Sequence, residues 1–269
     1  MYERSEVEVP FTAPSGAGAV VLGASRGIGR SLALQLAQEG HTVAALGRDV
    51  ESLREVQRAS PPGSVSCWPC DASQSAGFVR VLESVAQSLP RASVVVHCAA
   101  SVEPVGPVWE LDTTSLITTL SLNVTSAYLT AGWALAQMLT HRSGRLVLIS
   151  SGAARRPSRF RSAYAGSKAS VDHLVRTAAE ELRDLDVDVA ITGVYPGVVD
   201  TGMQTRMREI AASSPDRRVR HEMEAAVRRA GAGTPPSDVA RAVIQLLSRD
   251  AGEINGKIMA LRHGAWEES

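Results

Sequence analysis

The chain of 269 residues is electrically balanced, with 28 Lys and Arg against 28 Asp and Glu, so its charge favours neither nucleic acid nor an anionic membrane as a partner. No run reaches the roughly 18 apolar residues that a membrane span needs, and residues 1–16 lack the apolar segment of a signal peptide. Three cysteines form no evident disulfide framework, which favours a reducing, cytoplasmic location.

Short apolar runs alternate with helical patterns along the chain. After a flexible leader at residues 1–16, strands are predicted at 18–23, 41–46, 64–68, 93–98, 145–150, 187–194 and 256–261. Helices are predicted at 28–39, 50–58, 74–88, 113–141, 162–184 and 237–248. This alternation predicts one α/β domain over residues 17–269. We expect a Rossmann-type, doubly wound fold with a seven-stranded parallel sheet in the order 3-2-1-4-5-6-7 and helices on both faces.

Residues 198–236 interrupt this rhythm. The segment is rich in arginine and contains Pro215, Pro235 and Pro236. We expect a mobile insert that covers the substrate at the carboxyl edge of the sheet, where such folds bind ligands.

The first predicted helix begins within AVVLGASRGIGR, residues 19–30, which fits two motifs. Gly23-Ala24-Ser25-Arg26-Gly27 matches G-x-S-x-G, the nucleophile elbow of serine hydrolases. Gly23, Gly27 and Gly29 also match a glycine-rich turn that binds a dinucleotide phosphate. A hydrolase elbow usually follows several strands, whereas this turn opens the first strand–helix unit, so Ser25 is interpreted as a turn residue lying against phosphate. A serine hydrolase with His263 as base is the alternative.

Two arginines indicate the choice of cofactor. The second predicted strand ends at Leu46-Gly47-Arg48, where an NAD-binding fold usually carries an acidic residue for the ribose 2′-hydroxyl. Gly47 leaves space there, and Arg48 together with Arg26 could donate forked hydrogen bonds to a 2′-phosphate. The pattern predicts NADPH or NADP+; the alternative is that both are ordinary surface arginines.

A second cluster consists of Ser151, Tyr164 and Lys168, the last being one of only two lysines. Tyr164 and Lys168 are spaced i, i+4 at the start of a helix and share a face, and Ser151 ends the preceding strand. A tyrosine with a pKa of about 10 is a poor acid–base catalyst at neutral pH, and a nearby ammonium lowers that pKa. Together they could supply a proton donor in Tyr164, an ammonium group in Lys168 that lowers the pKa of the donor, and a hydrogen bond from Ser151 to a carbonyl oxygen. A non-catalytic nucleotide sensor, the third alternative, would not need this pair.

With these motifs the chain resembles the short-chain dehydrogenase/reductase family, of the compact type, over about residues 17–262. The matches, in family order, are Gly23-x-x-x-Gly27-Ile28-Gly29, Cys70-Asp71, Asn123, Ser151, Tyr164-x-x-x-Lys168 and Pro196-Gly197-x-x-x-Thr201.

The resemblance implies a catalytic set of Asn123, Ser151, Tyr164 and Lys168. In it, Tyr164 transfers the proton and Ser151 holds the substrate oxygen. Lys168 binds the nicotinamide ribose and lowers the tyrosine pKa, and Asn123 orders a water in a proton relay. Asp71 would meet the adenine, and Thr201 with the Val198 backbone would hold the nicotinamide carboxamide. The implied cofactor site comprises Gly23, Ser25, Arg26, Gly27, Ile28, Gly29, Arg48, Asp71, Ala99, Ala100, Tyr164, Lys168, Pro196, Gly197, Val198 and Thr201.

One stretch departs from the family pattern. Asn-Asn-Ala-Gly is replaced by His97-Cys98-Ala99-Ala100, and Ala100 puts a methyl group where the backbone runs close to the cofactor. His97 and Cys98 are interpreted as packing residues. The other histidines show no metal-ligand spacing, so no metal site is predicted. The C-x-x-C pair at 67 and 70 is interpreted as the end of a buried strand, since a redox motif should open a helix.

Residues 195–204 and 254–262 resemble the sepiapterin reductase and benzil reductase branch, whose members reduce vicinal dicarbonyls and related ketones with NADPH. This predicts a small-molecule substrate, an activated ketone or 1,2-dicarbonyl, in an apolar pocket supplied by Trp109, Val198, Val199, Met203 and Met207. The family usually forms dimers or tetramers, which implies a homo-oligomer assembled through the helices at 113–141 and 162–184.

A competing clue is the run of arginines just before Tyr164. They form either a solvated loop or an anion-attracting rim for a carboxylate, a phosphate or an acidic carrier protein. The second possibility favours a 3-oxoacyl thioester reductase or an alcohol dehydrogenase of secondary metabolism. The residues concerned are Arg155, Arg156, Arg159 and Arg161.

Overall fold

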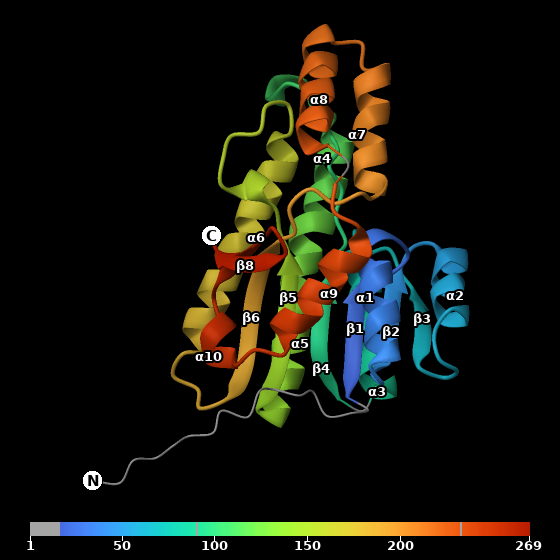
Figure 1. Cartoon of the computed structure of the whole chain (residues 1–269), viewed down its shortest axis with the longest axis vertical. Coiled ribbons are helices and arrows are strands. Elements are labelled where there is room, and N and C mark those ends of the chain that lie inside the picture. Colours follow the sequence, from blue (N-terminus) through green and yellow to red (C-terminus); the bar gives the residue numbers. More distant parts are fainter. Residues whose placement is uncertain (1–16, 90, 232) are drawn as a thin grey trace.

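The computed structural model describes residues 17–89, 91–231 and 233–269, so the expected leader at 1–16 lies outside the described residues. A sheet of eight strands runs through the molecule in the order β3-β2-β1-β4-β5-β6-β7-β8 (Figure 1). The first seven are parallel and keep the predicted order, which confirms the doubly wound fold. The strands are β1 Gly18–Leu22, β2 Thr42–Gly47, β3 Val65–Pro69, β4 Ala92–His97, β5 Ser143–Ile149, β6 Asp188–Tyr195, β7 Ile258–Arg262 and β8 Ala265–Glu268.

The eighth strand corrects the predicted count of seven. β8 pairs antiparallel with β7 across a turn at His263 and Gly264, whose φ angles are 50° and 81°. Two successive residues of positive φ are the geometry of a tight hairpin turn. The sequence gives little signal for β8 because the strand is short and mostly exposed, so it lacks a run of apolar residues.

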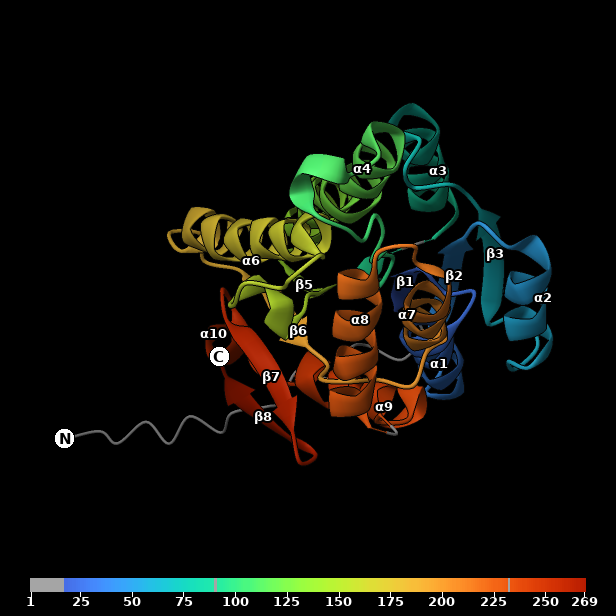
Figure 2. The same cartoon turned by 90° about the horizontal axis from the view of Figure 1, so that it is seen from above.

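Helices cover both faces of the sheet, as predicted (Figure 2). One face is covered by α1 Gly27–Gln38, α2 Val50–Arg58, α9 Pro236–Leu247 and the short α10 Ala251–Ile254. The other is covered by α3 Ser75–Ser88, α5 Ser126–His141 and α6 Ser162–Leu182.

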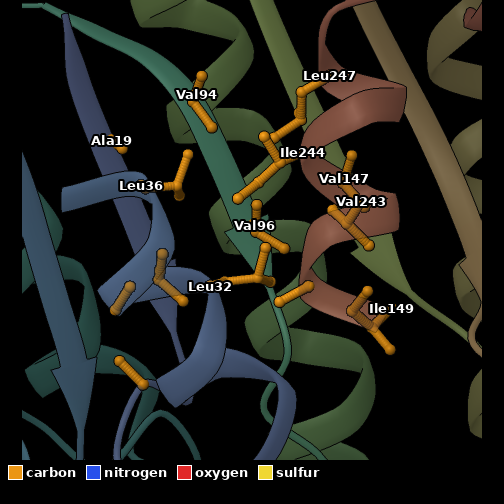
Figure 3. Packing of buried hydrophobic residues seen from close by; sticks show 14 of the residues in the cluster. Ala19, Leu32, Leu36, Val94, Val96, Val147, Ile149, Val243, Ile244 and Leu247 are labelled. Atoms are coloured by element: carbon orange, nitrogen blue, oxygen red, sulfur yellow. The ribbon is translucent and has the colours of Figure 1, made fainter. Parts of the chain in front are cut away.

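Strand side chains alternate between the two cores that these helices complete. In β1, Ala19 and Val21 enter the first core, whereas Val20 and Leu22 enter the second. Figure 3 shows the first core, where side chains of α1 and α9 meet those of β4 and β5. Because both faces are covered, the central strands are apolar along their whole length, and this rigid sheet fixes the loops at its carboxyl edge.

The insert at 198–236 contains two helices, α7 Gly202–Ser213 and α8 Arg217–Ala230, that stand together above the carboxyl edge of the sheet (Figures 1 and 2). Their inner side chains join loop residues in a third apolar cluster, which we call the cleft cluster. Its members are Val102, Phe160, Tyr164, Met207, Ala211, Val219 and Met223. The insert therefore packs directly on Tyr164. Among the described residues, no helix is long and apolar enough to cross a membrane.

Candidate active site

The β1–α1 turn has the backbone of a phosphate-binding loop. Gly23 and Gly27 have positive φ angles of 86° and 58°, and a Cβ atom on Gly29 would lie 2.2 Å from the Gly23 carbonyl oxygen. Arg26 precedes α1 without capping it through its side chain, so the first N–H groups of the helix can bind an anion. Ile28 instead packs against the first core.

Ser25 lacks the surroundings of a nucleophile. Its Oγ atom is buried and has no hydrogen-bond partner among the described residues. A nucleophilic serine needs a base within hydrogen-bond reach, yet His263 lies exposed in the β7–β8 turn. The geometry gives no support to the serine hydrolase alternative.

Arg26 and Arg48 are exposed at the carboxyl ends of neighbouring strands, β1 and β2. Asp49, which follows Arg48, caps α2 by accepting a hydrogen bond from the Ser52 N–H at 3.1 Å. Hydrogen bonds from Ser52, and more weakly the charge of Arg26, hold the pKa of Asp49 below its usual value. The carboxylate is therefore engaged with α2, and both guanidinium groups face solvent.

The ends of β3 and β4 complete this side of the site. Asp71 follows β3, and its Oδ1 accepts hydrogen bonds from the Ser73 N–H and hydroxyl at 3.0 and 2.7 Å. Ala99 lies against the glycine turn, since a Cβ on Gly23 would be 2.9 Å from the Ala99 nitrogen. Ala100 has a negative φ angle, so its methyl group requires no backbone strain.

His97 is buried and Cys98 is partly buried, and both are packing residues. His97 Nε2 lies 2.7 Å from the Ser126 hydroxyl, and burial lowers the pKa of His97 to about 3. Burial raises the pKa of Cys98 to about 12. Cys67 packs on the first core and Cys70 on the second, so the two thiols lie on opposite faces of the sheet, unlike a redox motif. The expected buried strand is wrong, because β3 lies at the edge of the sheet and is only partly buried.

Ser151, Tyr164 and Lys168 are brought together where β5 meets α6. Ser151 follows β5 in an extended conformation, and its Oγ accepts a hydrogen bond from the Ala153 N–H at 3.2 Å. Tyr164 and Lys168 are 8% and 2% exposed. The Lys168 ammonium donates to the Ile149 carbonyl at 2.7 Å and lies 5.9 Å from the centre of the Tyr164 ring.

The pKa of Tyr164 is raised, whereas the sequence predicts that Lys168 lowers it. Burial raises it above its ordinary value, and the hydrogen bond with Ser151 and the charge of Arg161 counteract this rise only in part. The expected lowering by Lys168 is not found, because burial penalises the phenolate more than the neighbouring groups stabilise it. Tyr164 is therefore a neutral phenol at neutral pH, the form that can donate a proton.

Asn123 lies in a π-helical turn, η2 Ser121–Thr125, which divides the single helix predicted at 113–141 into α4 Thr113–Leu120 and α5. The side chain is fully buried. Its Oδ1 accepts from the Ser101 N–H at 2.8 Å, and its Nδ2 donates to the Ser101 carbonyl at 2.8 Å and to the Ser167 hydroxyl at 3.0 Å. One lone pair of Oδ1 remains for a further donor.

The loop after β6 closes the site opposite the glycine turn. Pro196 is buried, and Gly197 has a φ angle of 74°. The Val198 carbonyl accepts from the Thr234 N–H at 2.8 Å, so its side of the loop is fixed. Thr201 precedes α7, and a Cβ atom on Gly27 would lie 3.1 Å from its methyl group.

Of the residues predicted to line an apolar pocket, two lie at the cleft cluster. Met207 belongs to the cleft cluster and Met203 packs against it. Val199 instead belongs to the first core, where the chain leaves the sheet. Val198 is exposed, and Trp109 is 75% exposed.

Beyond the cleft cluster lies an outer cavity of about 560 Å³. Its walls include Trp109, Pro157, Arg159, Phe160, Ala165 and Arg218. Phe160 belongs to both regions, so the cleft cluster and the outer cavity adjoin at this residue. Sequence patterns do not single out Phe160, because a lone aromatic residue in an arginine-rich loop gives no periodic signal.

The four arginines before Tyr164 have different surroundings. Arg155 donates to the Ser269 hydroxyl at 2.8 Å. Arg159 lies over the Phe160 ring, 4.7 Å from its centre. Arg156 is exposed and Arg161 half-buried. Only Arg159 of the four lines the outer cavity.

Comparison with known proteins agrees with this geometry. Residues 17–212 match the family model for short chain dehydrogenase. The chain is 30% identical over 253 residues to benzil reductase ((S)-benzoin forming) of Bacillus subtilis, which covers 90% of this chain and 97% of that protein. It is 32% identical over 260 residues to (3R)-3-hydroxyacyl-CoA dehydrogenase of Mus musculus, covering 91% and 95% of the two chains.

Among solved structures, a metagenomic short-chain oxidoreductase in complex with NADP matches with a TM-score of 0.70 and 28% identity, over 87% of this chain and 92% of that chain. The family model alone spans well over half of the residues, and the eight-stranded fold places its motifs at one edge of the sheet. The chain therefore belongs to the short-chain dehydrogenase/reductase family, an oxidoreductase family of the compact type that uses nicotinamide cofactors.

Proposed function

We propose that the protein is an NADPH-dependent carbonyl reductase in which Tyr164 donates the proton. The observation that carries the proposal is the meeting of Tyr164, Ser151 and Lys168 at the end of β5, on the same sheet edge as the glycine turn. When bound there, NADPH would supply the hydride. An alkoxide would develop on the substrate oxygen, so a neutral hydroxyl beside it is the group required.

Each polar residue has a separate task. Ser151 would hold the substrate oxygen by a hydrogen bond, and Tyr164 would pass its proton to it. Lys168 would bind the nicotinamide ribose. The remaining lone pair of Asn123 Oδ1 would order a water molecule through which Tyr164 regains its proton.

The cofactor would lie along the carboxyl ends of β1, β2 and β4. The turn at 23–29 would hold the pyrophosphate, and the loops at 99–100 and 196–201 would hold the nicotinamide side. Asp71 would meet the adenine. Arg26 and Arg48 are both exposed, and Gly47 stands where an acidic residue would favour NADH. The two arginines would bind the 2′-phosphate, so that NADPH is preferred over NADH.

The proposed substrate is a ketone activated by a neighbouring carbonyl, such as a 1,2-dicarbonyl. The apolar cleft cluster that contains Tyr164 includes Met207 and Met223, whose side chains adapt to irregular ligands. A neighbouring carbonyl makes the reacting carbon more electrophilic, so less stabilisation is required from Ser151 and Tyr164. The similarity to benzil reductase supports this substrate class.

A second candidate is a 3-oxoacyl thioester reductase or alcohol dehydrogenase with an anionic or carrier-bound substrate. It is favoured by Arg159 and Arg218 on the walls of the outer cavity and by the similarity to (3R)-3-hydroxyacyl-CoA dehydrogenase. Asp216, which accepts from Arg218 at 2.7 Å, weakens this argument because it offsets one of the two charges.

One panel of NADPH-oxidation assays tests both candidates. It contains 1,2-dicarbonyls, simple ketones and 3-oxoacyl thioesters, each at low and high salt. We expect turnover of dicarbonyls with little effect of salt. Efficient thioester turnover that falls with salt, and none with dicarbonyls, would favour the second candidate. Tight NADPH binding without turnover of any carbonyl would instead favour a non-catalytic sensor.

We also expect a cytoplasmic homodimer or homotetramer assembled through α4, α5 and α6. Ile117, Leu120 and Tyr128 on α4 and α5 are exposed to an unusual degree for large apolar side chains. Light scattering coupled to size-exclusion chromatography would measure the mass, and a monomer at micromolar concentration would contradict this expectation.

A further inference from the structure

A buried carboxylate lies directly behind the proposed catalytic residues. Asp172 follows Lys168 by one turn of α6 and is 4% exposed. Tyr164, Lys168 and Asp172 are each four residues apart, so they share one face of the helix. The proposed proton transfer does not itself use Asp172, and a buried acid requires partners that offset its desolvation.

Those partners link Asp172 to the end of β5. Asp172 Oδ1 accepts a hydrogen bond from the Ser150 hydroxyl at 2.5 Å, and Oδ2 accepts one from the Tyr195 hydroxyl of β6. The Ser150 hydroxyl also lies 3.3 Å from the Lys168 carbonyl. Ser150 stands between the Ile149 carbonyl, which accepts the Lys168 ammonium, and Ser151. The carboxylate thus fixes the segment that positions Ser151 and Lys168.

Asp172 also affects the protonation state of Lys168. Burial lowers the pKa of Lys168 to about 8, whereas Cys98 and Asp172 raise it. Two groups from the end of β4 face the ammonium, but burial keeps His97 neutral and Cys98 protonated near neutral pH. The Tyr164 phenol is neutral as well.

Asp172 in turn is faced by three polar groups besides Lys168. These are Ser150, Tyr195 and Arg176, the last from the next turn of α6. Burial raises the pKa of Asp172, and the two hydroxyl donors and both cations counteract the rise. A carboxyl group whose two oxygens both accept hydrogen bonds from hydroxyl groups is stabilised in its ionised form, because the ionised form is a pure acceptor. Of the groups facing Lys168, Asp172 is therefore the one that carries negative charge.

We propose that Asp172 is a positioning residue that keeps the buried Lys168 ammonium charged and, through Ser150, holds Ser151 and Lys168 in their working arrangement. The inference rests on the proposed function for its kinetic consequences. Its consequences for cofactor binding depend only on Lys168 touching the nicotinamide ribose.

The test compares Asp172→Asn with Tyr195→Phe. The first removes the charge and keeps the shape, whereas the second removes one hydrogen bond and keeps the charge. With the carboxylate lost, the ammonium is less stable and Lys168 should release its proton about one pH unit lower. For Asp172→Asn, the alkaline limb of kcat/KM should therefore move from near pH 8 towards pH 7. The loss should be about tenfold at pH 8.5 and small at pH 6.

A fluorescence titration of NADPH binding across the same pH range gives a readout independent of turnover. For Asp172→Asn, we expect the affinity for NADPH to begin to weaken at a lower pH than in the wild type. For Tyr195→Phe, we expect it to weaken at the same pH as in the wild type. Equal losses at every pH in Asp172→Asn, or the same limb shift in both variants, would overturn the proposal and leave a structural role. If no carbonyl is turned over, the proposed function fails, but the binding titration still decides the role of Asp172.

Discussion

The close contact between Ser25 and Gly47 offers a sharp test of the glycine turn. A Cβ atom on Gly47 would lie 2.3 Å from Ser25 Oγ, far inside van der Waals distance, but 3.5 Å from Ser25 Cβ, which is an ordinary contact. Gly47→Ala should therefore destabilise the protein by about 1–3 kcal/mol through overpacking. For a chain of this size the melting temperature should fall by roughly 2–12 °C.

The second substitution, Ser25→Ala, should restore most of that loss. Ser25 Oγ is buried without a partner among the described residues, so its removal alone should leave stability unchanged or slightly increased. In the double variant Gly47→Ala/Ser25→Ala, the added methyl group then has ordinary contacts of 3.5 Å with residue 25 Cβ and 3.6 Å with Leu53 Cδ2. A coupling free energy of about 1 kcal/mol or more is expected between the two sites.

Thermal and urea unfolding of the four proteins in the cycle would measure this coupling, with NADPH titrations alongside. Gly132→Ala in α5 is the matched control, since a Cβ there meets nothing within 4 Å and alanine favours a helix. If Gly47→Ala costs as much in the Ser25→Ala protein as in the wild type, the packing explanation is wrong. Loss of a hydrolytic activity in Ser25→Ala would revive the hydrolase alternative.

Three other outcomes are expected. Tyr164→Phe should abolish carbonyl reduction while NADPH binding stays nearly intact, because only the proton donor is lost; near-normal turnover would contradict the assigned role. Arg48→Asp should move the ratio of kcat/KM values from NADPH towards NADH by about tenfold or more, through loss of charge-assisted bonds, and an unchanged ratio would count against phosphate binding there. Arg145→Ala should lower the free energy of unfolding by about 2–5 kcal/mol, because removal of this fully buried side chain leaves a cavity and takes a donor from the Gly144, Asp188 and Arg249 carbonyls. In the exposed Arg142→Ala control, chemical denaturation should give a loss of less than about 1 kcal/mol.

The parallel part of the fold could be predicted because its signal is local and periodic. Continuous apolar strands such as β1 and β4 are buried on both faces, so their composition alone reveals their environment. The helices α7 and α8 were not predicted. Val219 and Met223 are spaced for a helix face, but arginines and Pro215 around them resemble an irregular loop. Those helices are stabilised by packing on Phe160 and Tyr164, which are distant in sequence.

In the candidate site, too, some features follow from local sequence patterns and others depend on tertiary packing. Residue type and spacing predict that Tyr164 and Lys168 share a helix face, and α6 places them so. The same spacing continues to Asp172, which could have been noticed as a third member of the series. The direction of the Tyr164 pKa could not be predicted, because it depends on how completely α7 and α8 bury the phenol. The break of the predicted helix at Asn123 likewise depends on tertiary hydrogen bonds to Ser101 and Ser167.

The burial of Tyr164 bears both on its protonation state and on the kind of substrate that could bind beside it. In the proposed reductase the substrate would lie against the apolar side chains that bury Tyr164, which favours a reacting end that is apolar apart from its carbonyl groups. Arg159 and Arg218 line the outer cavity, and neither belongs to the cleft cluster around Tyr164. A substrate that extends from Tyr164 past Phe160 into the outer cavity would bring an anionic group to these two arginines. In a series of anionic substrates with the same reacting carbonyl group, the salt dependence of kcat/KM should therefore increase with substrate length. A short dicarbonyl should be insensitive to salt, whichever of the two candidate substrates is the natural one.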